Sequence, residues 1–382
     1  MKKAFIALAL CAAFTSANAQ TLKETVGQKM LIGTALNVRQ VNGMDPKGLD
    51  IVKQHFNCVV AENCMKPEEL HPSPDKWTWE DADKLVAFAQ ANNIKVNAHT
   101  LVWHSQTPMW FFFKDNKMPE GFRPFGRRGG MDKSLLKSRE EMLAFLKDYI
   151  FTVAKHFKGK VVGWDVVNEA FEDDGSLRNS LWRQTIGDDF IEKAFEYAHE
   201  ADPDAQLYYN DYSMSKPAKV KGVCDYVRNM QKKGIRIDGI GMQSHNGLDY
   251  PDLDEYDKAI TEFASLGVKV MFTELDINVL PNPQQHNGAD ISQNFELRKE
   301  LNPYPDGLPK AKQKELEKRY LALFKIYKKH EKDIARITLW GVTDGDSWLN
   351  GWPVRGRTNY PLLFDRDYKA KPVVKKICKM FK

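Results

Sequence analysis

Eight short apolar runs, separated by longer segments with helical periodicity, constrain the fold of this chain more than any other feature of its sequence. Each run has the length of a strand, and the segments between them are long enough to hold a helix. Strands that alternate with helices form a parallel sheet, because each helix returns the chain to the same edge. The runs are Met30–Thr34, Asn57–Ala61, Ile94–Ala98, Val161–Val166, Gln206–Tyr209, Ile237–Met242, Val268–Thr273 and Ile337–Gly341.

Two of the intervening segments show a clear amphipathic pattern. One follows a capping box formed by Ser138 and Glu141, and its apolar residues recur at helical spacing: Met142, Leu146, Tyr149, Ile150, Val153 and Phe157. The other places Leu316, Tyr320, Leu323, Phe324 and Tyr327 at the same spacing. Both patterns predict helices that pack one face against a sheet.

Eight strand–helix units predict an α/β fold that closes into a (β/α)8 TIM barrel. The alternative is an open, doubly wound sheet, which predicts a glycine-rich nucleotide-binding turn after the first strand. The segment Gly33-Thr34-Ala35-Leu36-Asn37 does not match that turn. No Gly/Ser-rich or Pro-rich linker divides residues 20–382, so we expect them to form one domain.

Residues 1–19 have the pattern of a signal peptide. Lys2 and Lys3 precede an apolar run from Ala4 to Phe14, and Ala17-Asn18-Ala19 has the form of a signal peptidase site. The run is shorter than the roughly 20 residues that span a bilayer, and no later segment approaches that length. We therefore expect a bacterial protein that is exported to the periplasm or secreted, with no membrane span.

Charge and cysteine content exclude two further classes of protein. The formal net charge is +5, and removal of residues 1–19, which contain two lysines and no acid, lowers it to +3. So small an excess gives no basic tract that would neutralise a nucleic acid backbone. Cys11 lies in the signal segment, where it resembles a lipoprotein signal too weakly to predict a lipid anchor. The other four cysteines are too widely spaced to staple a small domain.

Polar residues follow seven of the eight apolar runs. In a barrel, the loops after the strands form the active face, whereas stability alone does not require polar groups there. These residues are Glu62-Asn63, His99, Asn168-Glu169, Asn210-Asp211, Gln243 with His245, Glu274 with Asp276, and Asp344. The sequence therefore predicts a polar site at the carboxyl end of the barrel.

Glu169 and Glu274 are the strongest candidates for chemistry at this site. They follow the fourth and seventh runs, which lie on roughly opposite sides of an eight-stranded barrel, so the two side chains can face each other across its mouth. Paired carboxyl groups suit glycoside hydrolysis, in which one protonates the leaving oxygen and the other attacks the anomeric carbon. We therefore expect a glycosidase.

Six motifs in chain order resemble those of glycoside hydrolase family 10. Trp164 to Glu169 resembles the family's acid/base strand, and Gly267 to Ile277 resembles its nucleophile strand. The other four resemble its second, third, sixth and eighth strand motifs: Glu62-Asn63 with Met65-Lys66, His99 to Gln106, Gln243-Ser244-His245, and Trp340-Gly341 with Trp348. The resemblance covers about residue 25 to the C terminus and implies a retaining endo-1,4-β-xylanase with a (β/α)8 catalytic domain and no cofactor.

The resemblance also implies roles for individual residues. Glu274 would be the nucleophile and Glu169 the acid that later becomes the base. Physical reasoning supports that order, because the negative charge of Glu274 should raise the pKa of Glu169, and that charge disappears when Glu274 is esterified. Asn168 would bind the sugar 2-hydroxyl, His245 would hold the nucleophile, and Asp276 would fix the tautomer of the His245 ring.

The matching positions further imply a set of residues that bind xylan or xylo-oligosaccharides. Charged and amide groups suit sugar hydroxyls, and indoles suit the apolar faces of sugar rings. The set is Glu62, Asn63, Lys66, His99, Trp103, Gln106, Gln243, Trp340 and Trp348. Trp110 and Trp182 are expected to be core residues. Cys64 and Asn97-Ala98 depart from the family pattern beside these positions, which puts substrate affinity in question more than bond cleavage.

Two long connections after the third and seventh runs, residues 111–137 and 278–310, leave the expected active face. They either shape the cleft or decorate the surface. The first carries Arg123, Arg127 and Arg128, which lead to the hypothesis that this loop contacts acidic side groups of a decorated xylan.

Several other functions are weighed against this prediction. His99, His104 and His245 match no strong zinc pattern, so we expect no metal. No Gly-x-Ser-x-Gly elbow is present, which argues against a serine nucleophile. A β-1,4-glucanase or a mixed xylanase and aryl-β-glycosidase would use the same site. A non-catalytic polysaccharide-binding barrel should lack one of the two glutamates, and both are present. We expect the protein to be a monomer.

Overall fold

A computed structural model describes residues 20–118, 133–284 and 288–382. The signal segment and Arg123, Arg127 and Arg128 lie outside the described residues. The eight predicted runs correspond to eight parallel strands: β1 (Leu31–Leu36), β2 (Cys58–Ala61), β3 (Lys95–Trp103), β4 (Gly163–Asn168), β5 (Gln206–Asp211), β6 (Gly239–Met242), β8 (Lys269–Asn278) and β9 (Ile334–Leu339).

The sheet closes on itself. Strands β1 to β6 pair in chain order, β6 pairs with β8, β8 with β9, and β9 with β1, all in parallel. Ile32 lies opposite Ile337 at one seam, and Ile240 lies opposite Val270 at the other. The predicted (β/α)8 barrel is therefore confirmed, and the open sheet is excluded because no strand of the barrel has a free edge.

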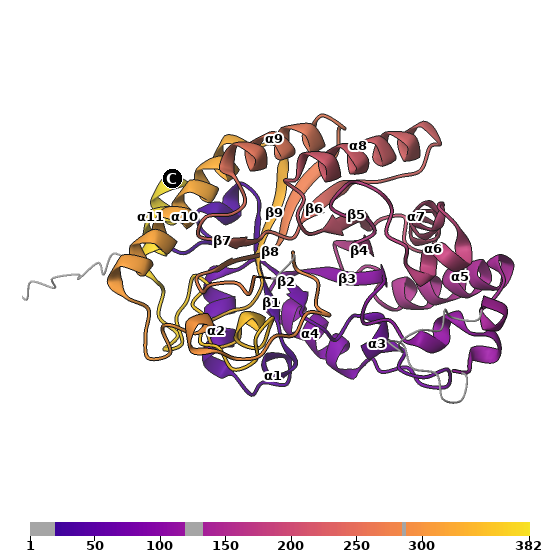
Figure 1. The fold of residues 1–382 in the computed structure, drawn as a ribbon, viewed down its shortest axis with the longest axis horizontal. Helices are drawn as coiled ribbons and strands as arrows, with labels where there is room; N and C mark the ends of the chain where they lie inside the picture. The colour runs from indigo at the N-terminus through magenta and orange to yellow at the C-terminus, as the bar shows by residue number, and fades with distance from the viewer. Residues whose placement is uncertain (1–19, 119–132, 285–287) are drawn as a thin grey trace, which may run out of the picture.

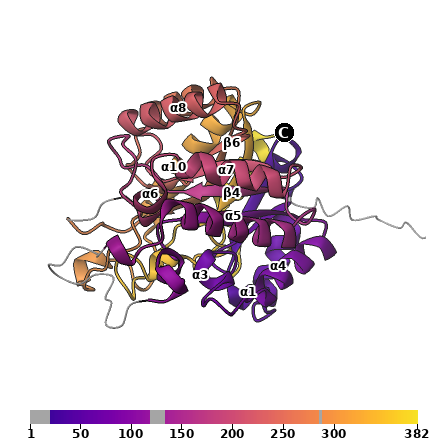
Figure 2. The same cartoon turned by 90° about the vertical axis from the view of Figure 1, so that its right-hand side faces the viewer.

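Helices surround the barrel strands on the outside (Figure 1). Several of them, such as α4, α7 and α9, pack against strands of the barrel, and in Figure 2 α5 and α7 run side by side. The helices are α1 (Val38–Val41), α2 (Pro46–His55), α3 (Pro67–Leu70), α4 (Glu80–Ala91), α5 (Arg139–His156), α6 (Leu181–Ile186), α7 (Phe190–Ala201), α8 (Pro217–Lys232), α9 (Leu253–Ala264), α10 (Lys310–Lys329) and α11 (Pro372–Met380).

Both amphipathic patterns form the predicted helices, α5 and α10. The capping box of α5 is present: the Ser138 hydroxyl accepts from the Glu141 N–H at 3.2 Å, and the Glu141 carboxylate accepts from the Ser138 N–H at 2.7 Å. All the apolar residues predicted to face the sheet are buried in both helices.

The third and seventh predicted strands were too short. The structure extends β3 to Trp103 and β8 to Asn278, past the polar residues at which the predictions stopped. Polar side chains are tolerated there because they bind one another; the Thr100 hydroxyl, for example, donates to the Asp165 carbonyl at 2.6 Å. The extended end of β8 also pairs with a strand that was not predicted, β7 (His245–Gly247), which sets His245 opposite Asp276.

The four cysteines of the described residues, Cys58, Cys64, Cys224 and Cys378, are buried and free. Burial raises the pKa of the Cys64 thiol to about 12. The cysteines therefore act as small apolar core residues.

Candidate active site

Glu169 and Glu274 lie at the carboxyl end of the barrel, as the sequence predicted. Glu169 directly follows β4, and Glu274 belongs to the extended part of β8. Each is only 5% exposed, and both line one cavity of about 200 Å³. Two almost fully buried carboxyl groups therefore share one small cavity.

The same cavity collects almost every residue predicted for the site. Its walls include thirteen of the fourteen: Glu62, Asn63, Lys66, His99, Trp103, Gln106, Asn168, Glu169, Gln243, His245, Glu274, Trp340 and Trp348. The fourteenth, Asp276, lines the adjoining cavity. These residues come from separate parts of the chain, and closure of the barrel brings them together.

The surroundings of Glu169 favour its protonated form. Burial, then the negative charge of Asp211 and, less strongly, that of Glu274 raise the pKa of Glu169 to about 7. The Trp103 and Gln243 side chains each donate to one carboxyl oxygen at 2.8 Å and partly oppose this shift. The predicted direction is thus confirmed, but the predicted cause was incomplete because burial and Asp211 outweigh Glu274.

The surroundings of Glu274 favour its charged form. Burial acts to raise the pKa of Glu274, but a hydrogen bond from His245 and the positive charges of His245 and Lys66 reverse the effect and lower it. His245 Nε2 lies 3.1 Å from Glu274 Oε2, and the Asn210 amide donates to Oε1 at 3.0 Å. The neighbours of Glu274 therefore hold its carboxyl group in the charged form.

His245 lies between two carboxylates. Its Nδ1 is 3.1 Å from Asp276 Oδ1, and burial, which lowers the pKa of the ring, is outweighed by Asp276 and Glu274, which raise it to about 10. Each ring nitrogen thus lies within hydrogen-bond distance of a carboxylate oxygen, which favours the charged ring. Asp276 therefore orients the ring and balances its charge, and its predicted effect on the tautomer stays a prediction.

Polar residues that follow β2 and β3 form a connected group in the wall of the cavity. Lys66 Nζ donates to Asn63 at 2.9 Å and to Gln106 at 2.8 Å, and the Gln106 amide donates to Asn63 at 3.2 Å. Burial lowers the pKa of Lys66 and raises that of Glu62. On β3, His99 is held from behind by Asp165, with 3.0 Å between Nδ1 and Oδ2.

The tryptophans divide into cleft and core residues. Trp340 and Trp348 line the cavity, and the Trp348 N–H donates to Asp276 at 2.7 Å. Trp103 also lines the cavity but is only 3% exposed, and its N–H donates to Glu169. Trp110 and Trp182 are buried core residues, as predicted.

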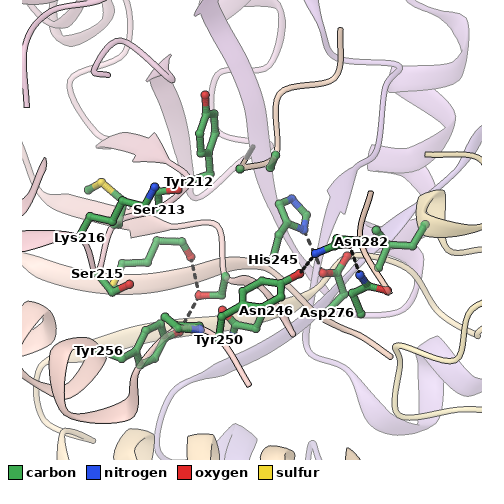
Figure 3. Close-up of a pocket in the computed structure, with 18 of the residues that line it drawn as sticks. Tyr212, Ser213, Ser215, Lys216, His245, Asn246, Tyr250, Tyr256, Asp276 and Asn282 are labelled. Atoms are coloured by element: carbon green, nitrogen blue, oxygen red, sulfur yellow. Dashed lines mark hydrogen bonds and ion pairs between the residues drawn. The ribbon is translucent and has the colours of Figure 1, made fainter. Parts of the chain in front are cut away.

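A second cavity of about 410 Å³ adjoins the first and shares His245, Ala289 and Trp348 with it. Figure 3 shows its side chains, with Tyr212 and Ser213 at one end, Asp276 and Asn282 at the other, and Tyr250 reaching toward Asn282. Gly288, Ala289 and Ile291 line one or both of the two cavities, which confirms that the connection after β8 shapes the cleft. Cys64 lines neither cavity in the described part of the chain.

Sequence reasoning missed several residues that contact the two glutamates. Asn210 and Asp211 were recognised as polar residues after a strand but received no role, although Asn210 binds Glu274, and the amides of Asn168 and Asn210 lie 3.0 Å apart. Arg178 donates to the Glu169 carbonyl at 2.9 Å. The position of Asn210-Asp211 after β5 was the available signal; nothing in the sequence marked Arg178.

Among residues 20–118, 133–284 and 288–382, no three His, Cys, Asp or Glu side chains are placed to hold a metal ion. Over the same residues, no helix combines the length and apolar character needed to cross a bilayer.

Comparison with known proteins gives a consistent result. The sequence pattern of Glycosyl hydrolase family 10 matches residues 21–380. Endo-1,4-beta-xylanase A of Xylanibacter ruminicola is 51% identical over 364 residues, which are 95% of this chain and 94% of that protein. A family 10 endoxylanase from a sugarcane soil metagenome has a TM-score of 0.87 at 41% identity, covering 94% of this chain and 99% of that one. An intracellular xylanase variant of Thermoanaerobacterium saccharolyticum, in complex with xylotriose, has a TM-score of 0.76 at 36% identity, covering 94% and 98% of the two chains. The chain therefore belongs to glycosyl hydrolase family 10.

Proposed function

We propose that this protein is an endo-1,4-β-xylanase that cleaves xylan by a retaining double displacement. The observation that carries the proposal is the pair of buried glutamates in one cavity, one with a raised pKa and the other with a lowered pKa. Such a difference is what an acid and a nucleophile need at the same pH. Family membership and the xylanase relatives support xylan as the substrate.

In the first step, Glu169 donates its proton to the leaving glycosidic oxygen while Glu274 attacks the anomeric carbon. The bond to the leaving oxygen breaks, and a glycosyl ester forms on Glu274. Asn168 binds the 2-hydroxyl of the same sugar, a contact that strengthens as positive charge develops on the ring.

In the second step, Glu169 acts as a base. Once Glu274 is an ester it no longer carries the charge that helps to raise the pKa of Glu169. Glu169 then takes a proton from a water molecule, which attacks the anomeric carbon and releases Glu274. Two displacements at one carbon restore its configuration.

Six of the remaining cavity residues, those that follow or belong to β2 and β3, bind the sugar on the non-reducing side of the cleaved bond. Lys66, Asn63 and Gln106 are already connected by hydrogen bonds, so they offer a preorganised polar surface to sugar hydroxyls. Glu62, His99 and Trp103 extend this surface, Gln243 also lines the cleft, and Trp340 and Trp348 provide apolar faces.

Residues 20–382 would then act as one monomeric catalytic domain, exported by a signal peptide at residues 1–19. The sequence pattern of that segment supports this part of the proposal. Expression of the full chain in a bacterial host tests it: a mature N terminus near Gln20, in a monomer outside the cytoplasm, is expected, and a cytoplasmic protein that keeps Met1 would contradict it.

The activity is tested by incubating the protein with xylan and with carboxymethylcellulose, and by following products with reducing-sugar assays and proton NMR. We expect cleavage of xylan into mixed oligosaccharides whose new reducing ends appear first as the β-anomer. A preference for carboxymethylcellulose would contradict the substrate, an α-anomer first would contradict the mechanism, and release of a single short product from the outset would contradict internal cleavage.

A further inference from the structure

The backbone at Glu169 adopts a conformation that needs support. Its φ angle is +56°, in the left-handed region that residues other than glycine rarely adopt. The peptide groups on both sides are held: the Glu169 N–H donates to the Asn210 carbonyl, and the Glu169 carbonyl accepts from Arg178, both at 2.9 Å. The direction of the Glu169 side chain therefore depends on groups outside β4.

The next two peptide N–H groups are held by two side chains of β5. The Ala170 N–H donates to the Tyr209 hydroxyl at 3.0 Å, and the Phe171 N–H donates to Asp211 Oδ2 at 3.4 Å. The Tyr209 hydroxyl in turn donates to the same oxygen of Asp211. One carboxylate oxygen therefore organises the chain that leaves Glu169.

Asp211 belongs to a fully buried ion pair. Its Oδ1 lies 2.8 Å from Lys219 Nζ, and both side chains are 0% exposed. The same oxygen accepts the Tyr212 N–H at 2.8 Å. Among the described residues, neither Asp211 nor Lys219 lines either cavity of the cleft, so substrate binding does not explain the pair. Removing two charges from water is costly, which makes a buried pair at this place an unusual feature.

Other charged groups also face the acid and its support. His104 Nδ1 lies 4.0 Å from Glu169 Oε2, and Glu274 acts on Glu169 across the cavity. On the other side, Lys219 lies 3.9 Å from Asp173, and the Tyr212 hydroxyl accepts from Arg178 at 2.8 Å. Of these neighbours, Asp211 has a larger effect on Glu169 than Glu274 does, and it acts to raise the pKa of Glu169.

We propose that Asp211, supported by Tyr209 and Lys219, is a positioning residue for Glu169: it fixes the chain after the acid and keeps a negative charge behind it. This inference rests on the proposed function, because it needs Glu169 to be the acid. Lys219 holds the Asp211 carboxylate in place and partly neutralises its charge. The two residues together therefore influence the pKa of Glu169.

The test compares Asp211→Asn, Asp211→Asn/Lys219→Met and Tyr209→Phe with the wild type. The substrates are aryl β-xylobiosides whose phenols range from acidic to weakly acidic, and kcat/KM is measured against pH. Asp367→Asn is the matched control, because its side chain is 78% exposed and faces Lys369.

For the wild type we expect the basic limb of kcat/KM near pH 7. In Asp211→Asn, the lost negative charge and the unpaired Lys219 both favour ionised Glu169, so the limb should move to lower pH by about one unit or more. The double variant, which leaves no unpaired cation, should show a smaller shift in the same direction. Tyr209→Phe keeps the charge, so its limb should stay near that of the wild type while kcat falls several-fold on weakly acidic phenols.

A wild-type basic limb in both Asp211 variants, with their melting temperatures showing folded protein, would overturn the electrostatic part of the inference. If Asp211→Asn does not fold, the basic limb of Asp211→Asn/Lys219→Met alone tests the electrostatic part. Unchanged kcat in Tyr209→Phe on every phenol would overturn the positioning part. Glu169→Gln distinguishes a failure of the proposed function from a failure of this inference. If Glu169→Gln cleaves xylobiosides of weakly acidic phenols at the wild-type rate, the proposed function fails. If Glu169→Gln is inactive but Asp211→Asn has the wild-type pH profile, only this inference fails.

Discussion

Glu169 and Glu274 are the same residue type, equally buried, on the same rim of the same barrel, yet the protein shifts their pKa values in opposite directions. Burial acts alike on both and favours the neutral form. The difference comes from the charged neighbours of each carboxyl group. The carboxylate of Asp211 acts on Glu169, whereas the cationic ring of His245 acts on Glu274. The comparison shows that the strand end sets where a carboxyl group lies, and its neighbours set which chemical role it can perform.

The largest expected effects come from replacing each glutamate with glutamine. Glu274→Gln should lose about 10⁴-fold or more in kcat on every substrate, because no other group can form the covalent intermediate. Glu169→Gln should lose about 10²–10⁴-fold on xylan but far less in the first step on an aryl β-xylobioside with a very acidic phenol, which leaves without a proton. Pre-steady-state release of the phenol measures that step.

Glu200→Gln is the matched control for this pair, because its side chain is 54% exposed and pairs with Lys147 at the surface. Equal dependence on the leaving group in Glu169→Gln and Glu274→Gln would remove the distinction between acid and nucleophile.

His245→Gln should have the next largest effect. Glu274 must be ionised to attack, and in the wild type its pKa is lowered, so activity should persist below pH 4.5 before the acidic limb is reached. Without the cation, and with Asp276 still nearby, the pKa of Glu274 should rise, so the acidic limb should move up by about 1–3 pH units. The basic limb, which reports Glu169, should move much less.

The pH profile of kcat/KM on xylan measures this prediction. His156→Gln provides a matched control, since His156 is paired with Asp83 on the outside of the barrel. An acidic limb at the wild-type position in His245→Gln would show that His245 does not set the charge of Glu274.

Lys66→Met should have the smallest effect on the difference between the pKa values of Glu169 and Glu274. The positive charge of Lys66 lowers the pKa of Glu274 less than His245 does, so the acidic limb should rise by less than in His245→Gln. KM should rise as well, because Asn63 and Gln106 lose the ammonium group that connects them. Measuring kcat and KM separately against pH distinguishes the two effects, and a larger shift than in His245→Gln would reverse the assignment.

Much of this site could be predicted from sequence because apolar periodicity places each polar residue at a strand end. That logic located Glu169, Glu274 and Gln243 without any structural coordinates. It did not predict that the pKa of His245 is raised, because that shift depends on two carboxylates, Asp276 and Glu274, at once. It also gave Asp211 no role, because the contact of Asp211 with the chain after Glu169 depends on the left-handed backbone at that residue, which periodicity does not reveal.

The closed sheet has a consequence for how the protein acquires activity. Glu169 follows β4 and Glu274 belongs to β8. The barrel that brings them into one cavity closes only when β1 pairs with β9, which joins Leu31 and Arg336 from opposite ends of the chain. Contacts so distant in sequence are slow to form, because a long loop must lose entropy before any pairing compensates for it. Hydrolytic activity should therefore be among the last properties to return on refolding, after the helices have re-formed. The rate at which the activity recovers would then report the rate at which the barrel closes.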